Sequence, residues 1–220
     1  MEFFRRREAR PSRLGILPGA FNPVTVAHLA LARAGLAHVD EVLFALPRVF
    51  PHKEYQGAPF ADRIQMLAAA LEEEPAFSIA AVDGGLFVEI ACECREFYGN
   101  DVALTFLCGR DAAERIAGWD YGRPGALAEM LNQFDLLVAT RGGDYRPPDE
   151  FQAAFRHLEV AGAFDHVSAS EVRRRIAGGA PWEHLVPAAV HERVREIYRV
   201  PPSEVIAPPR DWPPRTPPGC

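Results

Sequence analysis

The sequence lacks the features of a membrane-embedded or secreted chain. No apolar run approaches the roughly 20 residues that a helix needs to cross a bilayer, and the N-terminus has no apolar stretch typical of a secretory signal. Cysteine is scarce, with four among 220 residues: Cys92, Cys94, Cys108 and Cys220. Their order matches no paired zinc-ligand spacing. Free thiols, no protein-held metal and a cytoplasmic location are therefore expected.

An excess of positive charge is also missing. Lys and Arg number 24 against 30 Asp and Glu, which gives a formal net charge of −6. Such a chain is poorly suited to neutralising a nucleic-acid backbone. Small-molecule partners are expected instead, with neither nucleic acid nor membrane contacts, and a homo-oligomer is left open. The arginines from Arg5 to Arg7 are expected to be solvated, and no function is assigned to them.

The composition, with 48% hydrophobic and 25% charged residues, is that of a folded globular protein. Short apolar runs alternate with amphipathic stretches. This alternation predicts an α/β fold with a Rossmann-like doubly wound parallel sheet, helices on both faces and a C-terminal helical segment. One domain is expected over 13–200, between a flexible N-terminal arm at 1–12 and a proline-rich, disordered tail at 201–220.

The expected strands and helices can be placed by their periodicity. The expected strands are Leu14–Leu17, Val42–Leu46, Phe77–Val82, Ala103–Leu107 and Leu136–Ala139. The expected helices are Ala27–Gly35, Phe60–Leu71, Phe87–Phe97, Ala126–Leu131, Phe151–Leu158, Glu171–Ile176 and Ala188–Tyr198. Open sheets of this kind bind ligands outside the carboxyl ends of the strands, so the loops that follow strands are the expected site.

The first of these loops reads G-A-F-N-P-V-T-V-A-H, from Gly19 to His28, and precedes a helix rich in Ala and Leu. It is neither the dinucleotide fingerprint G-x-G-x-x-G nor the Walker loop of P-loop kinases. A glycine at the turn lets the backbone approach a ligand, and the helix N-terminus attracts an anion. Thr25 and His28 are three residues apart, so they share a helix face and can point at one phosphate.

This loop resembles the nucleotidyltransferase superfamily with the H-x-G-H signature. Within that superfamily it is similar to the nicotinamide/nicotinate mononucleotide adenylyltransferases, some of which carry threonine in place of the first histidine. The resemblance implies that the loop residues Gly19, Ala20, Phe21, Thr25 and His28 hold ATP. The stretch Pro51-His52-Lys53 resembles the P-P-H-K element of the bacterial members. It implies that Lys53 follows a phosphate through the reaction.

Two later stretches extend the resemblance. Gly109-Arg110-Asp111, followed by Trp119, is similar to the family's G-x-D element and its downstream tryptophan. It implies that Gly109 and Asp111 contact the bound nucleotide near ribose and that Trp119 stacks on the pyridine ring.

The segment from His166 to Arg175 resembles the family's I-S-S-T-x-I-R motif, with Ala169 and Ser170 replacing a serine and the threonine. Ser168 or Ser170 can cap a helix that faces the triphosphate, and Arg173 offers a planar fork to its oxygens.

The resemblance covers about Leu14 to Tyr198 and implies adenylyl transfer from ATP to the 5′-phosphate of nicotinate or nicotinamide mononucleotide, as in NAD biosynthesis. The catalytic cations expected are His28, Lys53 and Arg173. Mg²⁺ is expected to be held by the substrate rather than by the protein. The expected acceptor contacts are Asn22, Lys53, Phe87, Trp119 and Arg141.

Two alternatives stay open at this stage. One is another acceptor, such as phosphopantetheine or a phosphate alcohol. The other is a regulatory module that binds nucleotides without turnover, because the sequence departs from the family pattern at Ala169 and over Leu86–Ala91.

Overall fold

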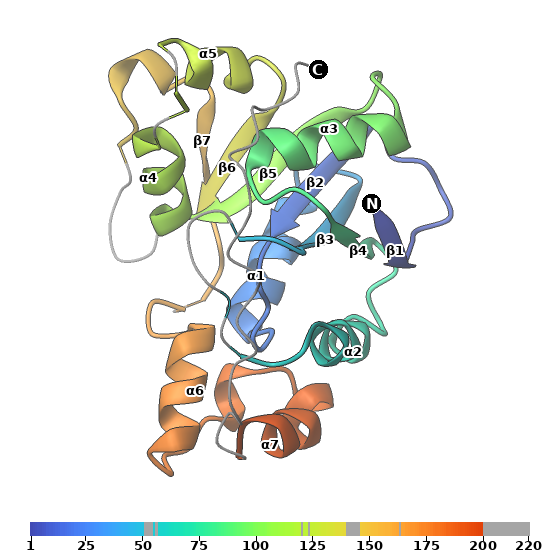
Figure 1. Cartoon of the computed structure of the whole chain (residues 1–220), viewed down its shortest axis with the longest axis vertical. Coiled ribbons are helices and arrows are strands. Elements are labelled where there is room, and N and C mark those ends of the chain that lie inside the picture. The colour runs from blue at the N-terminus through green and yellow to red at the C-terminus, as the bar shows by residue number, and fades with distance from the viewer. Residues whose placement is uncertain are drawn as a thin grey trace, which may run out of the picture.

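The computed structural model describes residues 1–50, 55, 57–119, 121–122, 124–139, 146–162 and 164–199. Within these ranges the centre of the molecule is a seven-stranded sheet with the order β1-β4-β3-β2-β5-β6-β7 (Figure 1). β1 runs antiparallel to β4, and the other neighbouring strands are parallel. The strands are β1 (Glu2–Arg5), β2 (Arg13–Pro18), β3 (Glu41–Pro47), β4 (Phe77–Val82), β5 (Ala103–Gly109), β6 (Asp135–Ala139) and β7 (Phe155–Leu158).

The order of the parallel strands reverses between β2 and β5. From β2 the chain builds β3 and then β4 on one side, and it later builds β5, β6 and β7 on the other. β2 and β5 pair directly, with Gly15 opposite Thr105. Because both strands point the same way, the loops that follow Pro18 and Gly109 leave the same edge of the sheet. This reversal is the point at which a doubly wound sheet opens a crevice for a ligand.

Helices cover both faces of the sheet. Alternate strand residues such as Leu17 and Phe44 pack against α1, α2, α6 and α7, whereas Ile16 and Phe106 pack against α3, α4 and α5. These helices are α1 (Val26–Gly35), α2 (Phe60–Ala70), α3 (Phe87–Tyr98), α4 (Arg110–Gly118), α5 (Ala126–Leu131), α6 (Ala169–Ala177) and α7 (His191–Arg199). Figure 1 shows α6 and α7 together beyond α1 and α2, at one end of the molecule. The Rossmann-like α/β fold with a C-terminal helical segment is thus confirmed.

The first residues form β1, whereas the sequence analysis placed them in a flexible arm. Arg5 donates hydrogen bonds to the backbone carbonyls of Leu71 and Glu74, and the backbone N–H of Arg7 donates to Ser78 Oγ over 2.9 Å. Arg6 lies 4.6 Å from the ring centroid of Phe97. The arginines expected to be solvated therefore fasten an edge strand to the sheet, because extended chain ends can satisfy their backbone groups by pairing.

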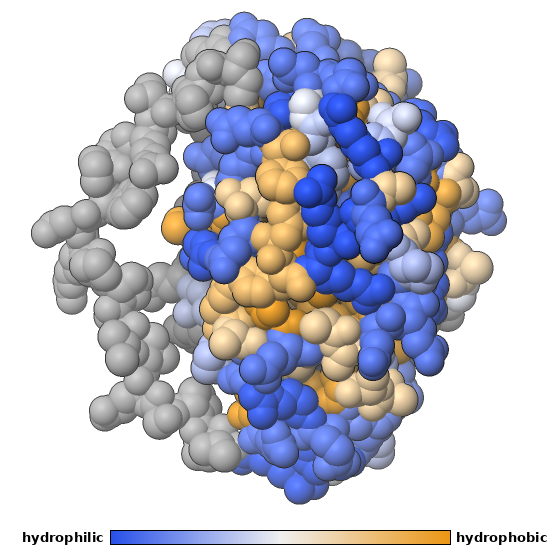
Figure 2. Space-filling view, turned by 90° about the vertical axis from the view of Figure 1, so that its right-hand side faces the viewer, coloured by the Kyte–Doolittle hydropathy of each residue, from blue (hydrophilic) through white to orange (hydrophobic). Residues whose placement is uncertain are grey.

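On the side of the molecule that carries β1, hydrophilic side chains border an apolar band (Figure 2). Among the large apolar side chains of the described chain, Phe4, Val49 and Phe97 are exposed. The Arg6 guanidinium over Phe97 covers part of this apolar surface while keeping its charge in water.

Two further regions differ from the sequence-based expectation. The segment expected as a helix from Phe151 to Leu158 begins at the last residue of a short 3₁₀ helix, η1 (Asp149–Phe151), and ends in strand β7. Phe155 and Leu158 are buried at the ends of β7, next to β6, so sheet pairing prevailed over a pattern that fits either structure. α4 was not expected as a helix at all. It places Arg110 and Asp111 in a first helical turn rather than in a loop.

Within the described ranges, no helix is long and apolar enough to cross a membrane. Cys94 and Cys108 are free and buried, as expected.

Candidate functional site

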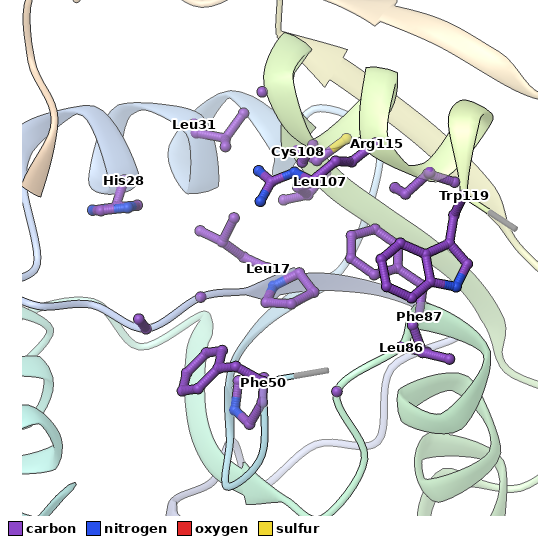
Figure 3. A pocket seen from close by; sticks show the side chains of 18 of the residues that line it. Leu17, His28, Leu31, Phe50, Leu86, Phe87, Leu107, Cys108, Arg115 and Trp119 are labelled. Carbon is purple, nitrogen blue, oxygen red and sulfur yellow. The ribbon is translucent and has the colours of Figure 1, made fainter. Parts of the chain in front are cut away.

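A cavity of about 280 Å³ opens where the strand order reverses (Figure 3). Its walls come from the ends of β2 and β5, from α1 and α4, and from the segments that follow β3 and β4. The lining residues are Leu17, Pro18, Gly19, Ala20, His28, Leu31, Pro47, Phe50, Gly85, Leu86, Phe87, Leu107, Cys108, Gly109, Ala112, Arg115, Ile116, Trp119 and Tyr121. Figure 3 shows His28 and Trp119 at opposite ends of the pocket.

The turn after β2 forms the floor of the His28 end. Gly19 continues the sheet with a 3.0 Å hydrogen bond from its N–H to the Ala45 carbonyl. Phe21 follows with a φ of 47°, in the left-handed region, and its buried ring lies 5.2 Å from the His28 ring. A Cβ on Gly19 would come within 2.9 Å of the Phe21 ring. The glycine is therefore required for Phe21 to fold under the turn and support the histidine.

Thr25 and His28 close the N-terminus of α1 by capping each other. The Thr25 side chain accepts from the His28 backbone N–H, and the Thr25 backbone N–H donates to His28 Nδ1 over 3.0 Å. An Nδ1 atom that accepts a hydrogen bond carries no proton, so the proton of the neutral imidazole is on Nε2. Thr25 is fully buried, whereas His28 lines the cavity. This reciprocal arrangement, a capping box, thus orients a ring N–H donor beside the N-terminus of a helix, where an anion is stabilised.

Arg63 supports the same turn from below and was not recognised from the sequence as a site residue. It is only 4% exposed, and its Nη1 donates to the Ala20 carbonyl over 2.9 Å. Its guanidinium lies 4.1 Å from the ring centroid of Tyr55 and 5.2 Å from that of Phe60. Burial lowers the pKa of Arg63 from its ordinary value, partly offset by Tyr55 and Tyr198. A buried cation directly behind the backbone of the turn favours an anion in front of it.

The C-terminal helices reach the turn through Asn22. Arg173 Nη1 donates to the Asn22 backbone carbonyl, across 151 residues of sequence. Tyr198 donates its hydroxyl to Asn22 Oδ1, which also accepts from the Ala58 backbone N–H over 3.1 Å. Asn22 is 4% exposed and does not line the cavity. The structure therefore gives Asn22 a bracing position, and its expected contact with the acceptor stays a prediction.

The opposite end of the cavity is aromatic. Phe87 stacks on Phe106 with a ring-centroid distance of 4.4 Å and an interplanar angle of 19°. Glu89 fixes the loop before α3, because its Oε2 accepts from the backbone N–H groups of Gly85 and Leu86 over 2.8 and 3.0 Å. Trp119 follows the last residue of α4 and completes this wall (Figure 3). Flat apolar faces of this kind suit a planar ring.

Gly109 and Asp111 lie at the end of β5. Gly109 precedes α4 and lines the main cavity, whereas exposed Asp111 stands in the first turn of α4. Asp111 lines a second hollow of about 340 Å³ together with Gly109 and Arg115. Gly109 thus borders both hollows, whereas Asp111 borders the second one.

Ser168 and Ser170 lie at the beginning of α6 in different roles. Ser168 is the N-cap, with its Oγ accepting from the Glu171 N–H over 3.1 Å. Ser170 lies within the first turn and accepts from Arg173 Nη2 over 3.2 Å. Of the two capping candidates, the structure selects Ser168.

The sequence-predicted residues divide into three groups. Those on the cavity wall are Gly19, Ala20, His28, Phe87, Gly109 and Trp119. Those beside it are Phe21, Asn22 and Thr25, which pack under the wall, and Asp111, Ser168, Ser170 and Arg173 on neighbouring surfaces. The remaining two, Lys53 and Arg141, together with Pro51 and His52, lie outside the described residues.

The described wall has few charged side chains. Among the described residues, no Asp or Glu lines the cavity, and Arg115, which was not singled out from the sequence, contributes a cationic side chain. Among the described residues, no group of three or more His, Cys, Asp or Glu side chains could hold a metal ion. Beyond their positions on helices, the two missed arginines have no sequence signal that distinguishes them from solvated ones. Arg63 lies on the buried face of α2, and Arg115 lies four residues before Trp119.

The comparisons with known proteins agree with this geometry. The Cytidylyltransferase-like family model matches residues 16–175. A relative from Moorella thermoacetica is 30% identical over 209 residues, covering 86% of this chain and 93% of its own length. One from Borreliella afzelii is 31% identical over 193 residues, covering 84% and 94%. Both are named probable nicotinate-nucleotide adenylyltransferase.

Among solved structures, Plasmodium falciparum nicotinic acid mononucleotide adenylyltransferase complexed with NaAD superimposes with a TM-score of 0.65 at 15% identity, over 84% of this chain and 95% of that one. At this identity the likeness supports the fold. The fold, the crevice at the strand reversal and the relatives agree. The chain belongs to the Cytidylyltransferase-like family and, within it, to the nicotinate-nucleotide adenylyltransferases.

Proposed function

We propose that this protein transfers the adenylyl group of ATP to the 5′-phosphate of nicotinate or nicotinamide mononucleotide, releasing pyrophosphate and forming a dinucleotide. The observation that carries the proposal is that the two ends of one cavity differ in their chemistry. Its one end has a glycine turn, a helix N-terminus and an oriented imidazole, which suit phosphate. Its other end has Phe87 and Trp119, which suit a planar ring.

The reaction needs no nucleophilic side chain. A phosphate oxygen of the mononucleotide attacks the α-phosphorus of ATP in line, forming a new P–O bond as the bond to the pyrophosphate oxygen breaks. Cys108 lines the cavity, but burial raises its thiol pKa to about 12, so it stays protonated at neutral pH. The protein contributes alignment and stabilisation of the negative charge that builds up on the leaving group.

The residue roles follow from position. The turn at Gly19 and Ala20 offers backbone groups to the phosphates, and His28 offers its Nε2–H. Arg173 is anchored to the Asn22 carbonyl, which brings its charge to the edge of the turn. We assign Lys53 to the same task on the strength of the sequence resemblance. Ser168 and Ser170 on α6 are assigned to the triphosphate, and Gly109 and Asp111 to the ribose.

Mg²⁺ fits this donor set as an ion that enters with the triphosphate. The cavity wall offers no carboxylate cage among the described residues, and Mg²⁺ is commonly held by phosphate oxygens and water. Bound in this way, it would neutralise charge on the phosphates. A cytoplasmic location, a homo-oligomeric state and the absence of nucleic-acid partners stay predictions.

The test is incubation of the purified protein with ATP, Mg²⁺ and one acceptor at a time: nicotinate mononucleotide, nicotinamide mononucleotide or phosphopantetheine. Pyrophosphate and dinucleotide should appear in equal amounts with a pyridine mononucleotide. Phosphate or ADP as the product would contradict the reaction class. Turnover with phosphopantetheine but with neither pyridine mononucleotide would show that the proposed acceptor is wrong. Binding of the nucleotides without any release of pyrophosphate would identify a regulatory module.

A further inference from the structure

Asn22 joins the turn after β2 to three other segments of the chain. Its Oδ1 accepts from the hydroxyl of Tyr198 on α7 and, over 3.1 Å, from the backbone N–H of Ala58, which precedes α2. Its backbone carbonyl accepts from Arg173 Nη1 on α6. Asn22 is 4% exposed, so water has little access to compete for these hydrogen bonds. One buried residue therefore fixes the turn relative to α2, α6 and α7.

The side-chain amide of Asn22 is held by two donors from different elements. A carbonyl oxygen has two lone pairs, and here the Tyr198 hydroxyl and the Ala58 N–H each use one. Rotation of an amide about χ2 is otherwise soft. Loss of one donor leaves a buried lone pair without its partner and frees this rotation. The Tyr198 hydroxyl therefore helps to set the orientation of Asn22.

The docking of α7 does not depend on the Tyr198 hydroxyl. Arg193 on the same helix forms an ion pair with Asp62 and donates to Gln65 Oε1 over 2.9 Å, both on α2. Val194 is fully buried, and Tyr198 packs against the same apolar core. Burial also raises the pKa of Tyr198, so the hydroxyl keeps its proton and remains a donor at neutral pH. Its hydrogen bond to Asn22 is thus a contact beyond those that hold the helix.

Arg173 depends on the same residue. Its Nη1 donates to the Asn22 carbonyl, and its Nη2 donates to Ser170 Oγ over 3.2 Å. A shift of Asn22 moves this carbonyl and weakens the contact that brings the guanidinium to the edge of the turn. Neither Tyr198 nor Asn22 lines the cavity. A change at Tyr198 therefore reaches the phosphate end of the cavity through Asn22.

We infer that Tyr198 is a positioning residue, which holds Asn22 so that the turn after β2 and Arg173 meet the phosphates of ATP. This inference rests on the proposed function and adds to it a residue from the last helix of the described chain. Tyr198 acts without touching the nucleotide. Its effect on ATP should therefore depend on the presence of the Asn22 side chain.

The test begins with Tyr198→Phe, which removes the hydroxyl and keeps the ring. This variant should raise the KM for ATP by about 3- to 10-fold, the scale of one lost hydrogen bond between neutral groups. A loss of folded protein alone lowers kcat and leaves this KM unchanged, so a change confined to kcat would overturn the inference. In an Asn22→Ala background, adding Tyr198→Phe should change the KM for ATP by less than about twofold, because the acceptor is already gone. An equal rise in both backgrounds would also overturn the inference.

Tyr98→Phe is the matched control. Tyr98 is another buried tyrosine that donates its hydroxyl to a side chain, Glu41 Oε1, but it packs on the other face of the sheet. This variant should leave the KM for ATP unchanged, and a rise equal to that of Tyr198→Phe would count against the inference.

Titration calorimetry with α,β-methylene-ATP measures the affinity for the nucleotide without turnover. Weaker binding to Tyr198→Phe in a protein that releases no pyrophosphate would support the inference and contradict the proposed reaction. Equal binding to Tyr198→Phe and to the unmodified protein would overturn the inference alone.

Discussion

The backbone N–H of Thr25 donates to Nδ1 of His28, and the His28 N–H is in turn accepted by the Thr25 hydroxyl. One pair of residues therefore both begins α1 and fixes which nitrogen of the imidazole carries its proton. The hydrogen bonds that cap α1 therefore also orient the ring N–H that is proposed to donate to the phosphate.

The two nitrogens of His28 can be separated by substitution. An Asn at position 28 can keep an acceptor near Nδ1 for the Thr25 N–H but cannot reach as far as Nε2, whereas Gln can place an amide N–H near Nε2. His28→Asn should therefore fold normally with turnover reduced by about 100-fold or more, the scale of one lost charge-stabilising donor. His28→Gln should retain more activity than His28→Asn. Steady-state pyrophosphate release measures both, with circular dichroism as the folding check, and near-normal activity of His28→Asn would remove His28 from the mechanism.

Thr25 is expected to act through His28. Thr25→Val keeps the buried shape but removes the capping oxygen, which should cost about 1 kcal/mol of stability, typical of a lost N-cap. Its kcat should also fall, because the imidazole of His28 is held less firmly once the Thr25 oxygen of the capping box is lost. Thr25→Ser restores the oxygen and should recover both properties. Thermal unfolding and kcat are measured together, and a stability loss with unchanged kcat would show that Thr25 does not position His28.

Arg63 is expected to hold the phosphate turn in place. Arg63→Met keeps an apolar stem against Tyr55 and Phe60 but leaves the Ala20 carbonyl without its donor. Loss of the donor to this part-buried carbonyl should cost about 1 kcal/mol, so the turn should relax and the KM for ATP should rise by about tenfold. For Arg63→Lys, which can still reach the carbonyl, the KM for ATP should lie between those of Arg63→Met and the unmodified protein. An unchanged KM for ATP in a folded Arg63→Met protein would show that the turn is rigid without this contact.

Glu41 supplies a pH-dependent contribution to stability that is remote from the site. Its side chain is fully buried at the start of β3, and Tyr98 donates to its Oε1 over 2.8 Å. Burial raises the pKa of Glu41 above the ordinary value of 4.5, and this effect outweighs the lowering by the hydroxyl neighbours Ser78 and Tyr98. The folded state therefore holds the proton more tightly than the unfolded state does. This contribution to stability is fully present below pH 4.5 and is lost as the pH rises through the raised pKa.

Glu41→Gln should remove that loss, because the amide stays neutral at every pH. The free energy of unfolding of the variant, relative to the unmodified protein, should increase as the pH rises from 4.5 and then level off. Tyr98→Phe removes a hydrogen bond to the carboxylate, so the contribution of Glu41 to stability should persist to higher pH in this variant. Urea unfolding at a series of pH values measures all three proteins. A constant difference between Glu41→Gln and the unmodified protein would contradict the assignment.

Sequence reasoning located the parts of the site that depend on local order. The strand, turn and helix from Leu14 to Gly35 were predicted because turn chemistry and helix periodicity act over a few residues. β1 and β7 were missed because their strand state depends on pairing with β4 and β6, which are distant in sequence. The contributions of Arg63 and Arg115 were missed for the same reason. A buried or cavity-facing arginine has the same sequence signal as a solvated one until its neighbours are known.

The Asn22 turn also has a consequence for the protein during its synthesis. Its own residues leave the ribosome early, but its partners Arg173 and Tyr198 are translated 151 and 176 residues later. A nascent chain can pair β2 with β3 long before these helices exist. The competent turn is therefore completed among the last events of translation, and a growing chain released before Tyr198 would carry the loop without its clamp.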